Sequence, residues 1–190
     1  FVELLRDAGY ATGLIGKSHL QSFTGLPATN KFKQKKGLSS PSRELRDAYK
    51  NNRHSPDYDL EDSTRWHTPL ADRVDGDFYG FQHVEIAAGH ADQASGDYLL
   101  WARKQREDFD SLTGYENALP DESIDAPQAW RTAVPEELYS TNWIADRSAH
   151  WIDQRTNDET PFFLQISFPD PHHPFTPPGK YWDMYDPLDV

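Results

Sequence analysis

The hydrophobic pattern at the start of the chain predicts a helix followed by a strand. A stripe of apolar residues recurs at helical spacing: Val2, Leu4, Leu5 and Ala8. Gly9 follows, where a glycine with positive φ suits the end of a helix. The short apolar run after it predicts a strand over residues 11–16. A helix, a glycine and a strand in this order form half of an α/β unit.

The second half of the chain repeats the alternation of helices and strands. A β-like pattern covers residues 81–87, and a helical one covers residues 95–109. A longer helix is predicted to start at Pro135, with acidic residues at its positive end. Its predicted apolar stripe recurs every three to four residues: Leu138, Thr141 or Asn142, Ala145, Ala149 and Ile152. The continuous apolar run at residues 162–168 is typical of a strand in the covered centre of a sheet.

These elements predict an α/β fold with a mainly parallel central sheet, formed by strands near residues 11–16 and 162–168 with helices packed on it. All 190 residues are expected to belong to one domain. Residues of about 21–76 interrupt the pattern with a polar, charged stretch that includes a basic run at 31–36. We expect a long surface excursion there, with one short helix near Glu44–Asn51.

Composition narrows the classes of partner. The chain has 31 Asp and Glu against 19 Lys and Arg, a formal net charge of −12, which repels nucleic-acid backbones and anionic membranes. We therefore expect neither as a partner. No run reaches the roughly 18 apolar residues of a membrane helix. Both ends look cut, which predicts a piece of a longer protein, so the compartment and the oligomeric state are left open.

The first candidate constellation follows the strand at residues 11–16, in the sequence GLIGKSHLQ. Lys17 and His19 stand two residues apart, so in an extended segment they point to the same side. Such a cationic donor pair suits a tetrahedral anion, and ligands of open α/β sheets bind at the carboxyl ends of the strands. The alternative is a surface lysine beside a histidine that caps a loop.

The second constellation follows the strand at residues 162–168, in the sequence FPDPHHPFTPP. His172 and His173 lie among prolines that restrict the backbone around them. A rigid backbone can hold an imidazole at a fixed point, as a preorganised site requires. The alternative is a proline-rich turn whose histidines have no role.

Taken together, the two stretches LLRDAGYATGLIGKSHL and PFFLQISFPDPHHPFTPPGKYWDMYDP resemble the sulfatase family of the alkaline-phosphatase superfamily. The resemblance is strong over about residues 2–20 and 160–187 and diffuse between them. It implies an α/β/α sandwich that hydrolyses sulfate esters. Carried over to this sequence, it implies that Lys17, His19 and His172 bind the sulfate group and assist the leaving oxygen, with His173 as a neighbour in the pocket.

The resemblance also implies parts that are missing from the matched stretches. The family uses a calcium ion and a formylglycine nucleophile made from Cys or Ser, and we expect both outside this chain, which has no Cys. SSPSR, from Ser39 to Arg43, fits the letters of the nucleophile motif, but it follows the Lys17 motif instead of preceding it. We therefore expect Ser39 not to be the nucleophile.

Two further groups are candidates for the substrate pocket. His90 follows a predicted strand and is a candidate substrate-binding residue. Tyr181, Trp182 and Tyr185 fit either an aromatic wall for substrate or ordinary packing. The expected partner is a sulfated small molecule or glycan. The alternatives are a phosphonate monoester or phosphodiester hydrolase of the same superfamily, and a non-catalytic remnant that binds sulfated glycans.

Overall fold

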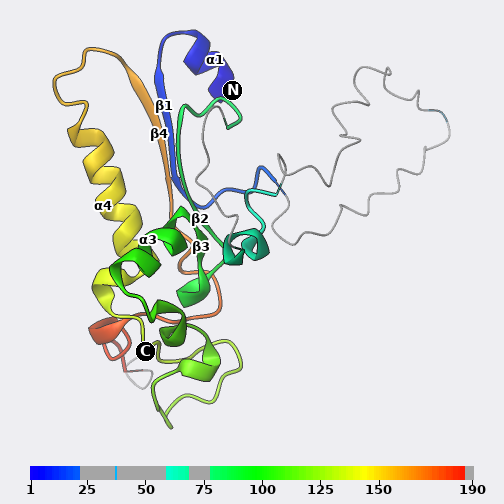
Figure 1. The fold of residues 1–190 in the computed structure, drawn as a ribbon, viewed down its shortest axis with the longest axis vertical. Helices are drawn as coiled ribbons and strands as arrows, with labels where there is room; N and C mark the ends of the chain where they lie inside the picture. The colour runs from blue at the N-terminus through cyan, green and yellow to red at the C-terminus, as the bar shows by residue number, and fades with distance from the viewer. Residues whose placement is uncertain (22–36, 38–58, 69–77, 187–190) are drawn as a thin grey trace.

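The computed structural model of the chain describes residues 1–21, 37, 59–68 and 78–186. Within these ranges the chain folds as an α/β structure around a sheet with the strand order β3-β2-β1-β4 (Figure 1). The strands are β1 (Ala11–Gly16), β2 (His83–Ala88), β3 (Ser95–Gly96) and β4 (Phe162–Ser167). β1 pairs in parallel with both β2 and β4, and only the short β3 is antiparallel. The predicted α/β class and the mainly parallel sheet are confirmed.

The register of the sheet brings the carboxyl ends of β1 and β4 to one level, and β2 runs two residues further in the same direction. Gly16, the last residue of β1, lies opposite Ile86 of β2 and Ser167, the last residue of β4. The backbone N–H of Lys17 continues the ladder by donating to the carbonyl of Ser167 at 2.9 Å. The segments that follow β1, β2 and β4 therefore leave the sheet at the same edge.

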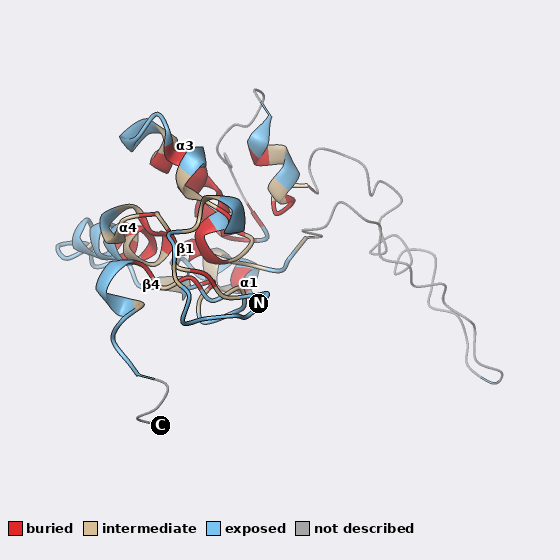
Figure 2. Ribbon diagram, turned by 90° about the horizontal axis from the view of Figure 1, so that it is seen from below, coloured by how far each residue is buried: buried red, intermediate tan, exposed pale blue. Residues whose placement is uncertain are grey.

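Helices cover the sheet on both faces, because its central strands are apolar on both sides. The helix α1 (Val2–Asp7) lies on one face, and α3 (Asp97–Gln105) and α4 (Ser140–Asp153) lie on the other (Figure 2). Leu14 of β1 points toward the α1 face, while its neighbour Ile15 points toward α3 and α4. This alternation is the normal consequence of strand geometry.

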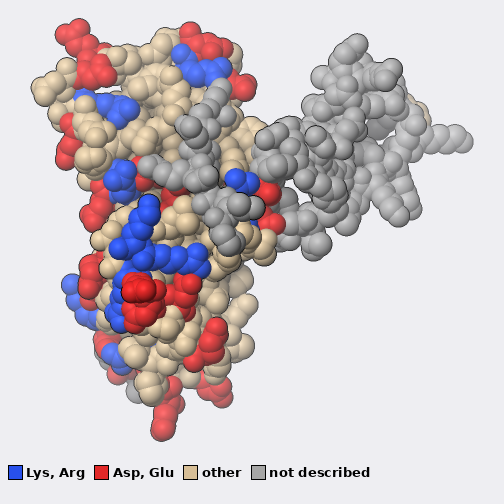
Figure 3. All heavy atoms as spheres, viewed as in Figure 1, with Lys and Arg blue, Asp and Glu red and all other residues tan. Residues whose placement is uncertain are grey.

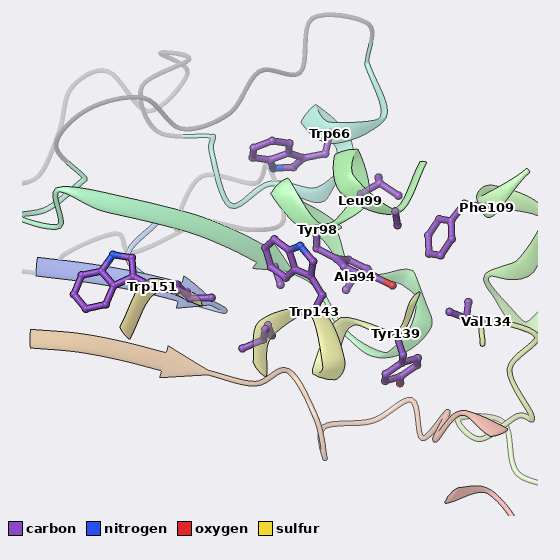
Figure 4. Close-up of a cluster of buried hydrophobic side chains, with 13 residues drawn as sticks. Trp66, Ala94, Tyr98, Leu99, Phe109, Val134, Tyr139, Trp143 and Trp151 are labelled. Atoms are coloured by element: carbon purple, nitrogen blue, oxygen red, sulfur yellow. The ribbon is translucent and has the colours of Figure 1, made fainter. Parts of the chain in front are cut away.

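The larger of the two core clusters lies on the face of α3 and α4 and is rich in aromatic rings (Figure 4). Its largest members are Trp66, Tyr98, Phe109, Tyr139, Trp143 and Trp151. Trp151 packs so closely on β1 that a Cβ at Gly13 would stand 3.1 Å from its ring. Gly13 is therefore the residue that lets α4 approach the sheet.

The long helix begins later than the sequence predicts, and it buries a different stripe. A 3-10 turn at Glu136–Leu138 follows Pro135, Tyr139 is extended, and α4 starts at Ser140. The residues of α4 that are buried are Ser140, Trp143, Ile144, Ser148 and Trp151. Ala149 and Ile152 of the predicted stripe are exposed. The prediction was wrong because the two tryptophans bury more apolar area than the smaller residues, and so decide which face turns inward.

A similar correction applies to α1, where only Val2 of the predicted stripe is buried and Leu4 is 73% exposed. Gly9, with φ of 89°, ends the helix as expected. The prediction that β4 lies in the covered centre of a sheet is also wrong for the described residues. β1 is its only partner there, and its side chains Phe162 and Ile166 are 44% and 41% exposed.

The remaining helical elements are short 3-10 turns. Apart from Glu136–Leu138 they are Ser63–His67, Ala91–Gln93, Phe109–Leu112, Tyr115–Asn117 and Gly179–Tyr181. Residues 59–68 fall inside the predicted excursion, yet Trp66 is fully buried. The helix expected near Glu44–Asn51, the basic run and Ser39 lie outside the described residues. Among the helices that are described, none has the length and apolar character needed to cross a membrane.

Candidate functional site

The side chains that the sequence singled out meet at the carboxyl edge of the sheet. Lys17 follows β1, His90 follows β2, and His172 follows β4. Because the strand order is β2-β1-β4, the strand that carries Lys17 stands between the other two. Residues far apart in the sequence therefore come together.

The contacts within this group are close. Lys17 Nζ lies 2.5 Å from His90 Nε2. The rings of His90 and His172 stack with their centroids 3.9 Å apart, and the ring of His173 lies 4.2 Å from that of His172. His172 Nδ1 is 2.6 Å from the carbonyl oxygen of His173, which fixes the orientation of the exposed His172 ring.

The electrostatics of the group favour a neutral His90 beside a charged Lys17. Burial and the charge of Lys17 lower the pKa of His90 to about 4, and His172, His173 and His19 add to this effect. Burial also lowers the pKa of Lys17 from its ordinary value. A half-buried lysine among imidazoles forms a local donor-rich site in a chain of net charge −12. Such a site suits a small anion.

Gly16 is required where β1 meets β4, immediately before Lys17. Its φ is 106°, and a Cβ at this position would stand 1.9 Å from the carbonyl oxygen of Ser167. Any larger residue would push the two strand ends apart. The glycine thus allows the backbone contact between Lys17 and Ser167 that fixes the start of the lysine segment.

Each of the three turns that carry these side chains is anchored by a carboxylate that the sequence did not single out; Glu61 and Asp92 are buried, and Asp170 is partly buried. Glu61, 1% exposed, accepts hydrogen bonds from the Ser18 hydroxyl and from the backbone N–H groups of Leu20 and Gln21, at 3.1 and 3.2 Å for the latter two. Glu61 therefore holds the segment that contains His19. The sequence around it, DLED, does not differ from other acidic stretches of the chain, so it did not indicate this role.

The turn after β2 is anchored by Asp92, two residues beyond His90. Asp92 accepts hydrogen bonds from the indole N–H of Trp130 at 2.9 Å and from the Thr132 hydroxyl at 2.7 Å. The backbone N–H of Gly114 donates to it at 3.3 Å. Burial raises the pKa of Asp92, and these hydrogen bonds oppose that shift.

The turn after β4 is anchored by Asp170, two residues before His172. Its carboxylate accepts a hydrogen bond from the Thr141 hydroxyl at 2.9 Å, in the first turn of α4. Pro169 is buried, and its carbonyl accepts from the backbone N–H of His172 at 3.2 Å. The proline-rich turn is thus bound to α4 through Asp170, which helps to hold it in one position.

The remaining predicted residues lie nearer the periphery. His19 is exposed and close enough to influence the pKa of His90. Tyr181 and Tyr185 are 43% and 78% exposed. Trp182 is partly buried and donates its indole N–H to Asp121 at 2.6 Å. Their contribution to a substrate wall stays a prediction.

A second polar feature lies on the same side of the sheet as α4. Glu85 of β2, with a side chain 3% exposed, receives two hydrogen bonds from Arg147 of α4, at 2.5 and 2.6 Å. His83 Nε2 lies 3.0 Å from the same carboxylate. The three side chains border a cavity of about 290 Å³ with His150, Trp151 and Gln154. On the face drawn in Figure 3, acidic and basic side chains lie intermixed.

The described residues do not offer a ready metal site. Among residues 1–21, 37, 59–68 and 78–186, no three His, Asp or Glu side chains are arranged to hold a metal ion together. The residues present therefore do not fit the calcium ion that the sequence resemblance implies.

Comparison with known proteins agrees with the motifs. The family model described as Sulfatase matches residues 1–187. A curated protein from Clostridium perfringens (strain 13 / Type A), named "Arylsulfatase", is 31% identical over 119 residues. That match covers 61% of this chain but only 23% of the relative. The chain thus matches about a quarter of the relative's length.

Proposed function

This chain belongs to the sulfatase family, and on that premise we propose that the natural protein containing it hydrolyses sulfate esters. The observation that carries the proposal is the convergence of Lys17, His90 and His172 from three adjacent strand ends. The carboxyl edge of a parallel sheet is the usual position of an α/β active site. The expected substrate is a sulfated small molecule or glycan.

In this proposal Lys17, His19 and His172 bind the sulfuryl oxygens. The Lys17 ammonium is a compact charge with three donors, and the imidazole N–H groups add directed hydrogen bonds. Such donors stabilise negative charge that grows on oxygen in the transition state, and they do so best when their positions are fixed beforehand. The three anchoring carboxylates, Glu61, Asp92 and Asp170, supply that fixation. His173 and His90 border the bound group.

The parts expected outside this chain remain part of the proposal. A calcium ion would neutralise the sulfate ester, and a formylglycine would supply the nucleophile. Neither can be built from the described residues, so no step is derived through them. The Lys17 and His172 roles concern binding and charge stabilisation, which this chain can provide itself.

The decisive experiment compares aryl sulfate and aryl phosphate esters as substrates of the natural protein, with Lys17→Ala and His172→Ala variants alongside. We expect sulfate turnover to exceed phosphate turnover, and each variant to lose about 100-fold in kcat/KM, the effect of one oxyanion donor. Preference for the phosphate or phosphonate ester would favour the other hydrolase of the superfamily. Binding of a sulfated glycan without turnover would favour the non-catalytic alternative.

A further inference from the structure

We propose that His90 is a positioning residue that holds the Lys17 ammonium in place, and that it does not itself bind the substrate. This inference rests on the proposed function, because it assigns His90 a role in the same site. It concerns a histidine whose ring nitrogen directly faces the Lys17 ammonium.

The first step of the argument is the freedom of the Lys17 side chain. A lysine has four rotatable bonds, and an exposed one loses considerable rotamer entropy when it is fixed on a ligand. Here the backbone of Lys17 is fixed on Ser167 at 2.9 Å, and the tip of its side chain meets His90 Nε2 at 2.5 Å. The backbone of Lys17 is therefore held by β4, and the tip of its side chain by the segment that follows β2.

The second step is the division of the three ammonium protons. One proton points to His90 Nε2, which leaves two donors for oxygens of an anion. His90 can accept that proton only as a neutral imidazole with its own proton on Nδ1. Its surroundings favour this state: Lys17 and His19 face it from the segment after β1, and His172 and His173 from the segment after β4. Asp92, on its own turn, is already bound to Trp130 and Thr132.

The third step is the stacking of the rings. The His90 ring lies at 25° to that of His172 with their centroids 3.9 Å apart. His90 therefore contacts both of the residues expected to touch the substrate. Its turn is held by Asp92, whose bonds to the interior do not depend on any ligand.

The test uses His90→Ala, His90→Gln and His90→Asn in the natural protein, with an aryl sulfate ester as substrate. The amide oxygen of Gln reaches about as far as Nε2 and can accept the lysine proton, whereas that of Asn is too short. We expect kcat/KM to fall roughly 10- to 100-fold in the Ala and Asn variants, the effect of losing a hydrogen bond to a charged group, and to recover to within about threefold in the Gln variant. Unchanged melting temperatures would separate this effect from misfolding.

The pH profile gives a readout that a merely structural role would not change. Protonation of His90 in the wild type removes the acceptor and places a like charge beside Lys17, so activity should fall near pH 4 on this account. The Gln variant cannot be protonated and should lack that acidic limb. A Gln variant no more active than the Asn variant, or an Ala variant with wild-type activity, would overturn the inference.

A titration independent of activity separates this inference from the proposed function. The pKa of His90, followed by NMR in the natural protein, should rise when Lys17 is changed to Met, because the adjacent cation is then absent. If the wild type hydrolyses no sulfate ester, the proposed function fails, and the titration still decides whether the pair exists. An unchanged His90 pKa in the Lys17→Met variant would refute the contact.

Discussion

The ion pair between Glu85 and Arg147 gives a stability prediction whose size follows from the structure. Burial alone would raise the pKa of Glu85, but hydrogen bonds from His83 and Arg147 outweigh it and lower the value from 4.5 to about 2. A shift of roughly 2.5 units corresponds to about 3.4 kcal/mol of stability. Arg147 is 35% exposed, so solvent screening reduces this figure, and we expect about 2–3 kcal/mol.

The change to make is Glu85→Gln, which keeps the shape of the side chain and removes its charge. Arg147 then faces a neutral amide, and the link between β2 and α4 weakens. The free energy of unfolding at pH 7 should fall by about 2–3 kcal/mol. Urea denaturation of the natural protein, followed by tryptophan fluorescence, measures it. Asp153→Asn, at an exposed position of the same helix, is the matched control and should change stability by less than about 0.5 kcal/mol.

The pH dependence of the free energy of unfolding provides the sharper test. Because the folded-state pKa of Glu85 is depressed, its contribution is fully present above about pH 4.5 and disappears as the pH falls toward 2. The stability difference between the wild type and Glu85→Gln should therefore shrink over that interval. A difference below about 0.5 kcal/mol at pH 7, or one that stays constant from pH 7 to pH 2.5, would refute the reasoning.

Three further predictions concern the frame of the site. Gly16→Ala should cost about 4 kcal/mol or more, or prevent soluble expression, because its Cβ would stand 1.9 Å from the Ser167 carbonyl at a φ of 106°; the melting temperature checks this. Glu61→Gln should lower kcat/KM about 10-fold and the free energy of unfolding by about 1–3 kcal/mol, measured by urea denaturation, because its amide NH2 would face a backbone N–H that now donates to the carboxylate. Asp170→Ala should destabilise by about 1–3 kcal/mol, measured by urea denaturation, because it leaves the Thr141 hydroxyl unpaired.

The sequence predicted the strands at the site better than it predicted what surrounds them. The predicted strand at residues 11–16 coincides with β1, because glycines and apolar residues delimit it locally. The proximity of Lys17 to His172 followed from two motifs at parallel strand ends. His90 lies beside them because β2 is next to β1 in the sheet. No local sequence pattern indicates which strands are neighbours.

The features that sequence reasoning missed depend on tertiary partners. Glu61, Asp92 and Asp170 are ordinary acidic residues in an acidic chain until the fold supplies their donors. The inward face of α4 is decided by the fit of Trp151 against Gly13, and these two residues are far apart in the sequence. Exposure of β4 likewise depends on its neighbours and not on its own apolar residues.

The parallel pairing of β1 with β4 has a consequence for the order in which the molecule can assemble. Ala11 pairs with Phe162, roughly 150 residues later, so the partner of β1 leaves the ribosome long after β1 itself. Until β4 has been synthesised, the Lys17 segment lacks the Ser167 carbonyl that accepts its backbone hydrogen bond. Contacts of such long sequence separation form slowly because a large loop must close first. Anion binding at this edge should therefore begin only after β4 has been synthesised and has paired with β1.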